Sequence, residues 1–149
     1  MAAGIVIRPP RLDERADWEP LWKGYLDFYN TSVPTEVYDT TWARLHDRNE
    51  PMWLLGAYVD GRLRGIVHYL YHRSCWTVGD YCYLQDLFVA EEARKLGIGR
   101  ALIEAVYREA HAAGASRVHW LTHETNATAR ALYDTLADRP GFIQYRKLF

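Results

Sequence analysis

The chain has 149 residues, of which 18 are lysine or arginine and 19 are aspartate or glutamate, so its formal net charge at pH 7 is −1. This balance gives no general attraction to nucleic acid or to an anionic membrane, and we expect neither as a partner. Because 49% of the residues are hydrophobic and 25% are charged, we expect one globular domain over residues 1–149.

The first half of the chain predicts a strand, two helices and a hairpin. Residues 5–8 form a short strand, and a helix follows with Asp17 as its N-cap. A second helix begins at Pro34, a residue that suits the start of a helix. Two strands, Met52–Val59 and Arg62–His72, are separated by an Asp-Gly pair, which is a strong signal for a two-residue hairpin turn.

The second half predicts three further strands and two helices. A strand over residues 75–89, with an irregularity near Gly79, leads through a loop to a long helix from Ile98. A strand over 117–122, a helix over 126–136 and a last strand over 142–149 complete the order β-α-α-β-β-β-α-β-α-β. Three antiparallel strands followed by a βαβ unit indicate an α/β (α+β) fold, with a mixed, mostly antiparallel sheet and helices on both faces.

The cysteines and histidines predict a reduced protein without a metal. Cys75 and Cys82 form no Cys-x-x-Cys pair, and both fall in the strand-like stretch, so we expect buried free thiols. His68 and His72 are four residues apart on a strand, which gives no ready metal pair. The chain has no run of about 18 apolar residues and no apolar signal core, so we expect a cytoplasmic protein.

A glycine-containing loop connects the fourth strand to the long helix. It reads Arg94-x-x-Gly97-x-Gly99. Two glycines at a helix N-terminus let backbone N–H groups approach an anion, and the helix dipole and the arginine favour the same negative charge. The loop therefore predicts a phosphate or pyrophosphate site, with an ordinary strand-to-helix turn as the alternative. A Walker loop is excluded by Arg100-Ala101 after the second glycine, and a dinucleotide fingerprint by Leu102.

A second motif lies downstream of the glycine loop. Val89 and the glycine loop, followed downstream by Asn126-x-x-Ala129-x-x-Leu132-Tyr133, resemble in order and spacing the two signatures of the GNAT superfamily of N-acetyltransferases. The resemblance covers nearly the whole chain and is closest to small diamine and polyamine acetyltransferases and their yeast relatives. Many members have two strands after the last helix, whereas only one fits here, so we expect that strand to pair across a homodimer.

The resemblance implies acetyl-coenzyme A as the donor. Its pantetheine arm would pair with the strand end formed by Leu87, Phe88 and Val89. Asn126 matches a position that hydrogen-bonds the cofactor in the family, although an asparagine there also suits a helix N-cap. The pyrophosphate would lie against the loop formed by Arg94, Lys95, Leu96, Gly97, Ile98, Gly99 and Arg100.

The resemblance also implies catalytic roles. Spacing alone favours Tyr133 as a packing residue on a helix face. The motif reverses this, because Tyr133 matches the family's general acid, which protonates the departing thiolate. The polyamine-acetylating relatives often carry two consecutive acids where this chain has Gln85-Asp86. Asp86 is therefore either the base that deprotonates the amine or a structural carboxylate. Glu124 is a weaker candidate.

The acceptor site would be covered by the two early helices, which contribute Tyr29 and Tyr38. We expect an enzyme that moves an acetyl group to a primary amine of a small molecule, such as a polyamine or an amino acid. The alternatives are a lysine acetyltransferase for proteins or peptides, a non-catalytic acyl-CoA sensor, and a nucleotide-binding domain unrelated to acetyl transfer.

Overall fold

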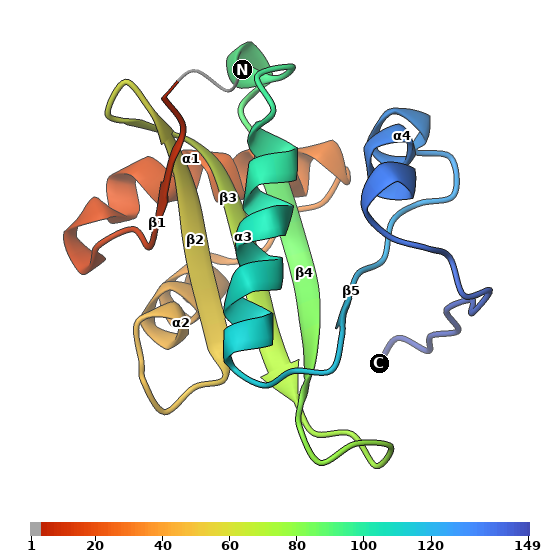
Figure 1. The fold of residues 1–149 in the computed structure, drawn as a ribbon. Coiled ribbons are helices and arrows are strands. Elements are labelled where there is room, and N and C mark those ends of the chain that lie inside the picture. The colour runs from red at the N-terminus through yellow and green to blue at the C-terminus, as the bar shows by residue number, and fades with distance from the viewer. Residues whose placement is uncertain (1–3) are drawn as a thin grey trace.

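The computed structural model describes residues 4–149. Four α-helices, five strands and two short 3-10 turns form one mixed α/β unit (Figure 1). The elements in chain order are β1 (Val6–Arg8), η1 (Leu12–Glu14), α1 (Arg15–Phe28), α2 (Thr35–Leu45), β2 (Met52–Val59), β3 (Arg62–His72), β4 (Tyr81–Val89), η2 (Glu91–Ala93), α3 (Ile98–Ala112), β5 (Val118–His119) and α4 (Ala127–Leu136).

The five strands form one sheet in the order β1-β2-β3-β4-β5. All neighbouring pairs are antiparallel except β4 and β5, which are parallel. Helix α1 packs on β3 and β4, helix α2 packs on β2, and helix α3 covers the opposite face (Figure 1). The predicted mixed, mostly antiparallel sheet with helices on both faces is therefore confirmed.

The β2–β3 hairpin follows the sequence prediction residue by residue. Asp60 and Gly61 both have left-handed backbone angles, with φ of 51° and 74°. Two successive left-handed residues form the type of turn whose twist matches that of paired strands, and aspartate followed by glycine adopts it readily. This turn sets the register of β2 against β3, in which Val59 pairs with Arg62.

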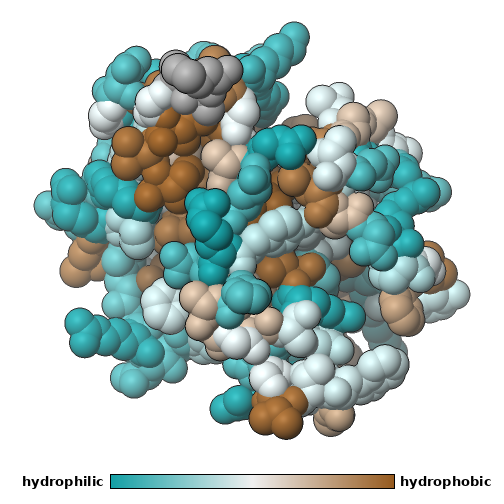
Figure 2. Space-filling view, in the orientation of Figure 1, coloured by the Kyte–Doolittle hydropathy of each residue, from teal (hydrophilic) through white to brown (hydrophobic). Residues whose placement is uncertain are grey.

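The core lies on both faces of the sheet. On one face Trp18, Trp22 and Trp42 gather between the two early helices and the strands, and Trp18 is fully buried. On the other face, Ile98 and Leu102 of α3 pack closely over Gly65, whose missing side chain makes room for them. The outer surface mixes hydrophilic and hydrophobic residues in the view of Figure 2. Within residues 4–149, no helix combines the length and apolar character needed to cross a bilayer.

The predicted last strand is wrong for the single chain. Residues 137–149 have no regular secondary structure, and the large apolar side chains from Phe142 to Phe149 are exposed. The physical reason is the lack of an edge to pair with, because β5 has only two residues. The strand expected over 117–122 is shortened to the same two residues.

Two smaller expectations are also corrected. Asp17 is not an N-cap, because the turn η1 runs directly into α1 and places Asp17 in the first helical turn. Cys75 is exposed rather than buried, because β4 begins only at Tyr81 and the preceding residues form a loop; Cys82 is buried as expected.

Candidate active site

The sheet opens between β4 and β5. These strands pair only at Cys82–Val118 and Tyr83–His119, and they diverge beyond that point (Figure 1). The Ala90 N–H donates to the Arg64 carbonyl on β3 at 2.8 Å. Because consecutive strand residues alternate in direction, Leu87 and Val89 point their N–H and C=O groups away from β3. The end of β4 therefore presents an open edge to an amide-bearing ligand.

A β-bulge at Gln85 decides which side chains line this site. His68 pairs with Asp86, but Tyr69 pairs with Leu84, so Gln85 is left without a partner on β3. Paired residues share a face of the sheet, and one extra residue reverses the alternation. The bulge therefore places Asp86 on the face covered by α1, and Gln85 itself is exposed.

Asp86 contacts a buried histidine, and that histidine in turn contacts a tryptophan. The Asp86 Oδ2 atom lies 3.0 Å from His68 Nδ1. The Trp18 indole N–H donates to His68 Nε2 at 3.0 Å. The side chains of His68 and Asp86 are 7% and 12% exposed, so this carboxylate is nearly enclosed but retains access to one side.

Tyrosine rings surround the carboxylate. Burial, and secondly the charge of Asp86, raise the pKa values of Tyr25, Tyr29 and Tyr83. Tyr25 and Tyr29 lie together on α1, with ring centroids 5.0 Å apart. A carboxylate among aromatic rings attracts an organic cation, because charge and ring quadrupoles act in the same direction.

Tyr133 enters the same region from α4. Its ring packs edge-on against Trp120 with a centroid distance of 5.4 Å. Burial, and secondly nearby Tyr29, raise the pKa of Tyr133. Tyr133 therefore holds its proton at neutral pH. Tyr29 is a neighbour of both Tyr133 and Asp86.

The glycine loop forms a helix N-terminus open to an anion. Gly97 is the N-cap of α3 with φ of 84°, and Lys95 also has a left-handed φ of 71°. The first intrahelical bond runs from the Ala101 N–H to Gly97, which leaves the N–H groups of the first turn free for a ligand. Residues 94–97 and Arg100 are exposed, whereas the Ile98 side chain belongs to the core and offers only its backbone.

Two arginines border this helix N-terminus. Arg94 donates from Nε to the Val89 carbonyl at 3.2 Å, which ties the loop to the open edge of β4. Arg100 donates to the Thr135 hydroxyl at 2.9 Å, which ties α3 to α4. Positive charge and free backbone donors thus lie at the end of the open strand, and this arrangement suits the pyrophosphate and pantetheine of coenzyme A.

The remaining predicted residues take mixed positions. Asn126 caps α4, accepting from the Ala129 N–H at 3.4 Å. Phe88 packs its ring against Gly24 of α1. Tyr38 packs edge-on against Trp18, and the Glu124 side chain is exposed to solvent.

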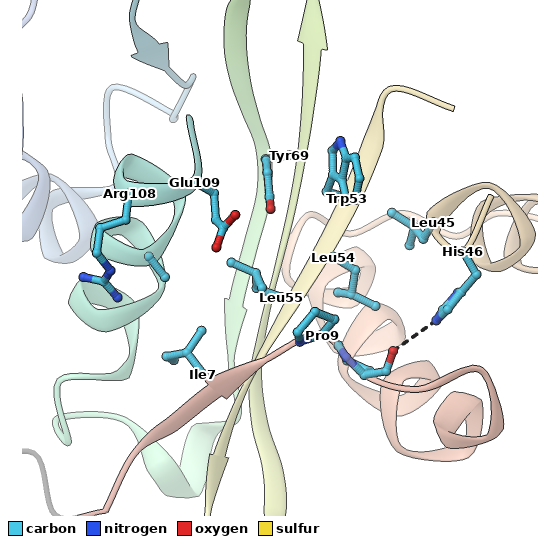
Figure 3. Close-up of a pocket in the computed structure, with 12 residues that line it drawn as sticks. Ile7, Pro9, Leu45, His46, Trp53, Leu54, Leu55, Tyr69, Arg108 and Glu109 are labelled. Carbon is cyan, nitrogen blue, oxygen red and sulfur yellow. Dashed lines mark hydrogen bonds between the residues drawn. The ribbon is translucent and has the colours of Figure 1, made fainter. Parts of the chain in front are cut away.

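A cavity of about 330 Å³ lies elsewhere, at the β1–β2 side of the sheet (Figure 3). His46 contacts the Pro10 carbonyl there at 3.1 Å, and Trp53, Leu55 and Tyr69 form part of its lining. A hollow at the end of α1 is bordered by Asp27, Asn30, Thr31 and Ser32. Asp86 and Tyr133 line neither of them, because their site lies along an open strand edge.

Residues 18–137 match the sequence profile described as the acetyltransferase (GNAT) family. This chain belongs to the GNAT family. It is 37% identical over 145 residues to the D-amino-acid N-acetyltransferase HPA3 of Saccharomyces cerevisiae, covering 96% of this chain and 90% of that protein. It is also 31% identical over 80 residues to a thialysine N-epsilon-acetyltransferase of Caenorhabditis elegans, covering 54% of this chain and 49% of the relative.

Solved structures agree in fold. A ribosomal-protein-alanine N-acetyltransferase from Brucella melitensis superposes with a TM-score of 0.79 at 24% identity, covering 98% of this chain and all of the other. An aminoglycoside acetyltransferase from a soil metagenome gives 0.79 at 16% identity, with 97% of each chain covered. These structures agree with the GNAT fold, whereas the N-acetyltransferase class of this chain rests on the family profile and on the similarity to HPA3.

Sequence reasoning missed His68, Trp18 and Tyr83. In the sequence His68 was considered only as a metal ligand, whereas in the structure it lies against Asp86 across the β3–β4 pair. β3 and β4 follow each other in the sequence, so their antiparallel pairing could be expected. Whether the His68 and Asp86 side chains lie on the same face depends on the bulge.

Proposed function

We propose that this enzyme transfers an acetyl group from acetyl-coenzyme A to a primary amine of a small molecule by direct attack. The observation that carries the proposal is the divergence of β4 from β5. This divergence leaves an open strand edge at which the donor can bind. The nearly enclosed carboxylate of Asp86, where the acceptor can bind, lies beside that edge.

The donor would lie along β4 and the start of α3. Leu87 and Val89 offer backbone groups that can pair with the pantetheine amides as a further strand would. The free N–H groups at the start of α3, with Arg94, would bind the pyrophosphate. When bound, acetyl-coenzyme A supplies an acetyl group activated as a thioester.

The acceptor would be an ammonium ion bound between Asp86 and the tyrosine rings. Asp86 takes a proton from the ammonium, directly or through water, and the freed nitrogen attacks the thioester carbonyl carbon. As the carbon–sulfur bond breaks, Tyr133 donates its phenolic proton to the sulfur. The attacking nitrogen loses its second proton to the Tyr133 phenolate, which restores the phenol. The products are the acetylated amine, free coenzyme A and one proton passed from Asp86 to solvent.

The printed activities of the relatives support a small amine as acceptor. HPA3 is named for D-amino acids and the worm relative for thialysine, and an Arabidopsis relative, 33% identical over 54 residues and matching 24% of that protein, is named for L-ornithine. All three names describe compounds with an amino group. The exposed Gln85 in place of a second carboxylate favours a singly charged amine over a polyamine.

The test is release of the coenzyme A thiol in the presence of candidate acceptors. The panel contains D- and L-amino acids, thialysine, ornithine, diamines, polyamines, aminoglycosides and basic peptides. We expect saturable turnover with amino acids or another compact amine. Turnover confined to basic peptides would replace the proposal with a peptide acetyltransferase, and binding of acetyl-coenzyme A without release would favour a sensor.

We also propose that the enzyme is a homodimer. Its C-terminal segment exposes Phe142, Ile143 and Tyr145 at 86%, 76% and 87%, and such a segment gains burial by pairing as a strand with a second copy. Light scattering should give twice the chain mass of 17.4 kDa, and a variant ending at residue 140 should be monomeric. A full-length monomer would refute this.

A cytoplasmic location stays our proposal, on the basis of two free cysteines.

A further inference from the structure

Three polar groups form a buried chain beneath the acceptor site. Trp18 on α1 donates to His68 on β3 at 3.0 Å, and His68 contacts Asp86 on β4 at 3.0 Å. Trp18 is 0% exposed and His68 is 6% exposed. These three hydrogen-bonded groups therefore link the core to Asp86, the carboxylate proposed to bind the amine.

The indole fixes the tautomer of the imidazole. An indole N–H is only a donor, so His68 Nε2 must accept and therefore carries no proton. The ring proton then lies on Nδ1, where it is donated to Asp86 Oδ2. A second proton on Nε2 would set two buried donors against each other and leave both without a partner. The chain thus runs in one direction, from Trp18 to His68 to Asp86.

This arrangement is more than the core needs for packing. Ile66, two residues before His68 on the same face of β3, is 2% exposed and fills its place with an apolar side chain. A buried imidazole carries desolvation costs that an apolar residue of similar size would avoid. The polar chain instead holds one carboxylate oxygen, Oδ2, in a fixed orientation.

We propose that His68 is a positioning residue whose tautomer is set by Trp18, and that together they aim Asp86 at the acceptor nitrogen. This inference rests on the proposed role of Asp86 as the base. Neither Trp18 nor His68 touches the substrate, and both act through the orientation of the carboxylate. The bulge at Gln85 is what brings Asp86 to the imidazole.

The kinetic test compares His68→Leu with His68→Asn. Leucine fills the site without a donor, and kcat should fall about 10²-fold because a misdirected base loses its reactive geometry. Asparagine places an amide N–H close to the position of Nδ1, and kcat should stay within about fivefold of wild type. KM for acetyl-coenzyme A should be unchanged in both variants.

A double-mutant cycle separates positioning from packing. Trp18→Phe should lower kcat about tenfold in the wild-type background but less than about twofold in the His68→Leu background, because the chain is already broken there. Trp42→Phe is the matched control: the Trp42 ring packs at a tilt against Trp18 with centroids 4.9 Å apart, so this variant should lose stability without losing kcat. Additive effects on kcat, or an equal loss in the control, would show that packing alone matters.

Nitrogen NMR of the histidines gives a readout that does not require turnover. His68 should show a protonated Nδ1 and a bare Nε2, and this pattern should weaken in Trp18→Phe. The opposite tautomer in the wild-type enzyme would overturn the proposal even if no acceptor had been found. If Asp86→Asn abolishes turnover while His68→Leu does not, the positioning role fails and the base assignment stands; if Asp86→Asn is fully active, the base assignment fails.

Discussion

Replacement of Asp86 by asparagine should change how the reaction depends on pH. Asparagine keeps the shape of the side chain and still offers an oxygen to the His68 N–H 3.0 Å away, so the fold should be preserved. It removes the group that accepts the proton of the ammonium. The variant can then use only the acceptor molecules that are already neutral in solution.

The size of the effect follows from the acceptor's own titration. An alkyl ammonium has a pKa of about 10.4, so at about pH 7.4 roughly one molecule in 10³ is neutral. We therefore expect kcat/KM for the amine to fall about 10³-fold at that pH and to recover about tenfold for each pH unit up to about pH 10. The wild-type profile should be much flatter over the same range.

The assay is coenzyme A release at saturating acetyl-coenzyme A, measured against pH. Asp80→Asn is the matched control, because Asp80 precedes β4 and pairs with exposed Arg73 at 3.2 Å, away from His68. Thermal unfolding confirms that both variants fold. An Asp86→Asn profile parallel to that of the wild type would refute the role of Asp86 as the base, as would an equal loss in Asp80→Asn.

Three other outcomes can be measured directly. Tyr133→Phe should lower kcat by about 10²-fold or more with little change in acetyl-coenzyme A affinity, and unchanged turnover would reject the general acid. Arg8 holds the pKa of Glu14 at about 2, below its ordinary 4.5; the resulting stability is present above pH 4.5 and is lost as the pH falls toward 2. Glu14→Gln should therefore cost about 1–2 kcal/mol at neutral pH, after screening at partly exposed Arg8, and almost nothing near pH 2 in acid-unfolding curves. Burial raises the pKa of the Cys82 thiol to about 12, so a thiol reagent should label only Cys75 in the native protein, and two equivalents under native conditions would contradict the burial.

Local signals in the sequence predicted much of the fold. The Asp-Gly pair placed the hairpin turn between its two strands, and the N-cap role considered for Asn126 beside cofactor binding is found at the start of α4. Gly97 was expected at a helix N-terminus and is found there in a left-handed conformation. These features depend on short-range backbone preferences, so a single sequence is enough to predict them.

Apart from the Asp17 cap, which failed for a local reason, the errors share one cause, which is dependence on partners distant in the sequence. The terminal segment has the composition of a strand, but pairing requires an edge that β5 is too short to provide. Cys75 reads as part of a strand whose pairing begins only at Tyr81. His68 looks like an ordinary strand histidine in the sequence, because the residue that it contacts, Asp86, lies on the neighbouring strand.

The sequence by itself indicated the GNAT class of this protein, because the glycine loop and the Asn126–Tyr133 motif resemble the two signatures of that family in order and spacing. Only the tertiary structure decided what surrounds Asp86. One unpaired residue, Gln85, reverses the alternation of β4, and the packing of both sheet faces selects that register. That reversal turns the carboxylate from the α3 face to the imidazole of His68 and the rings of Tyr25 and Tyr29.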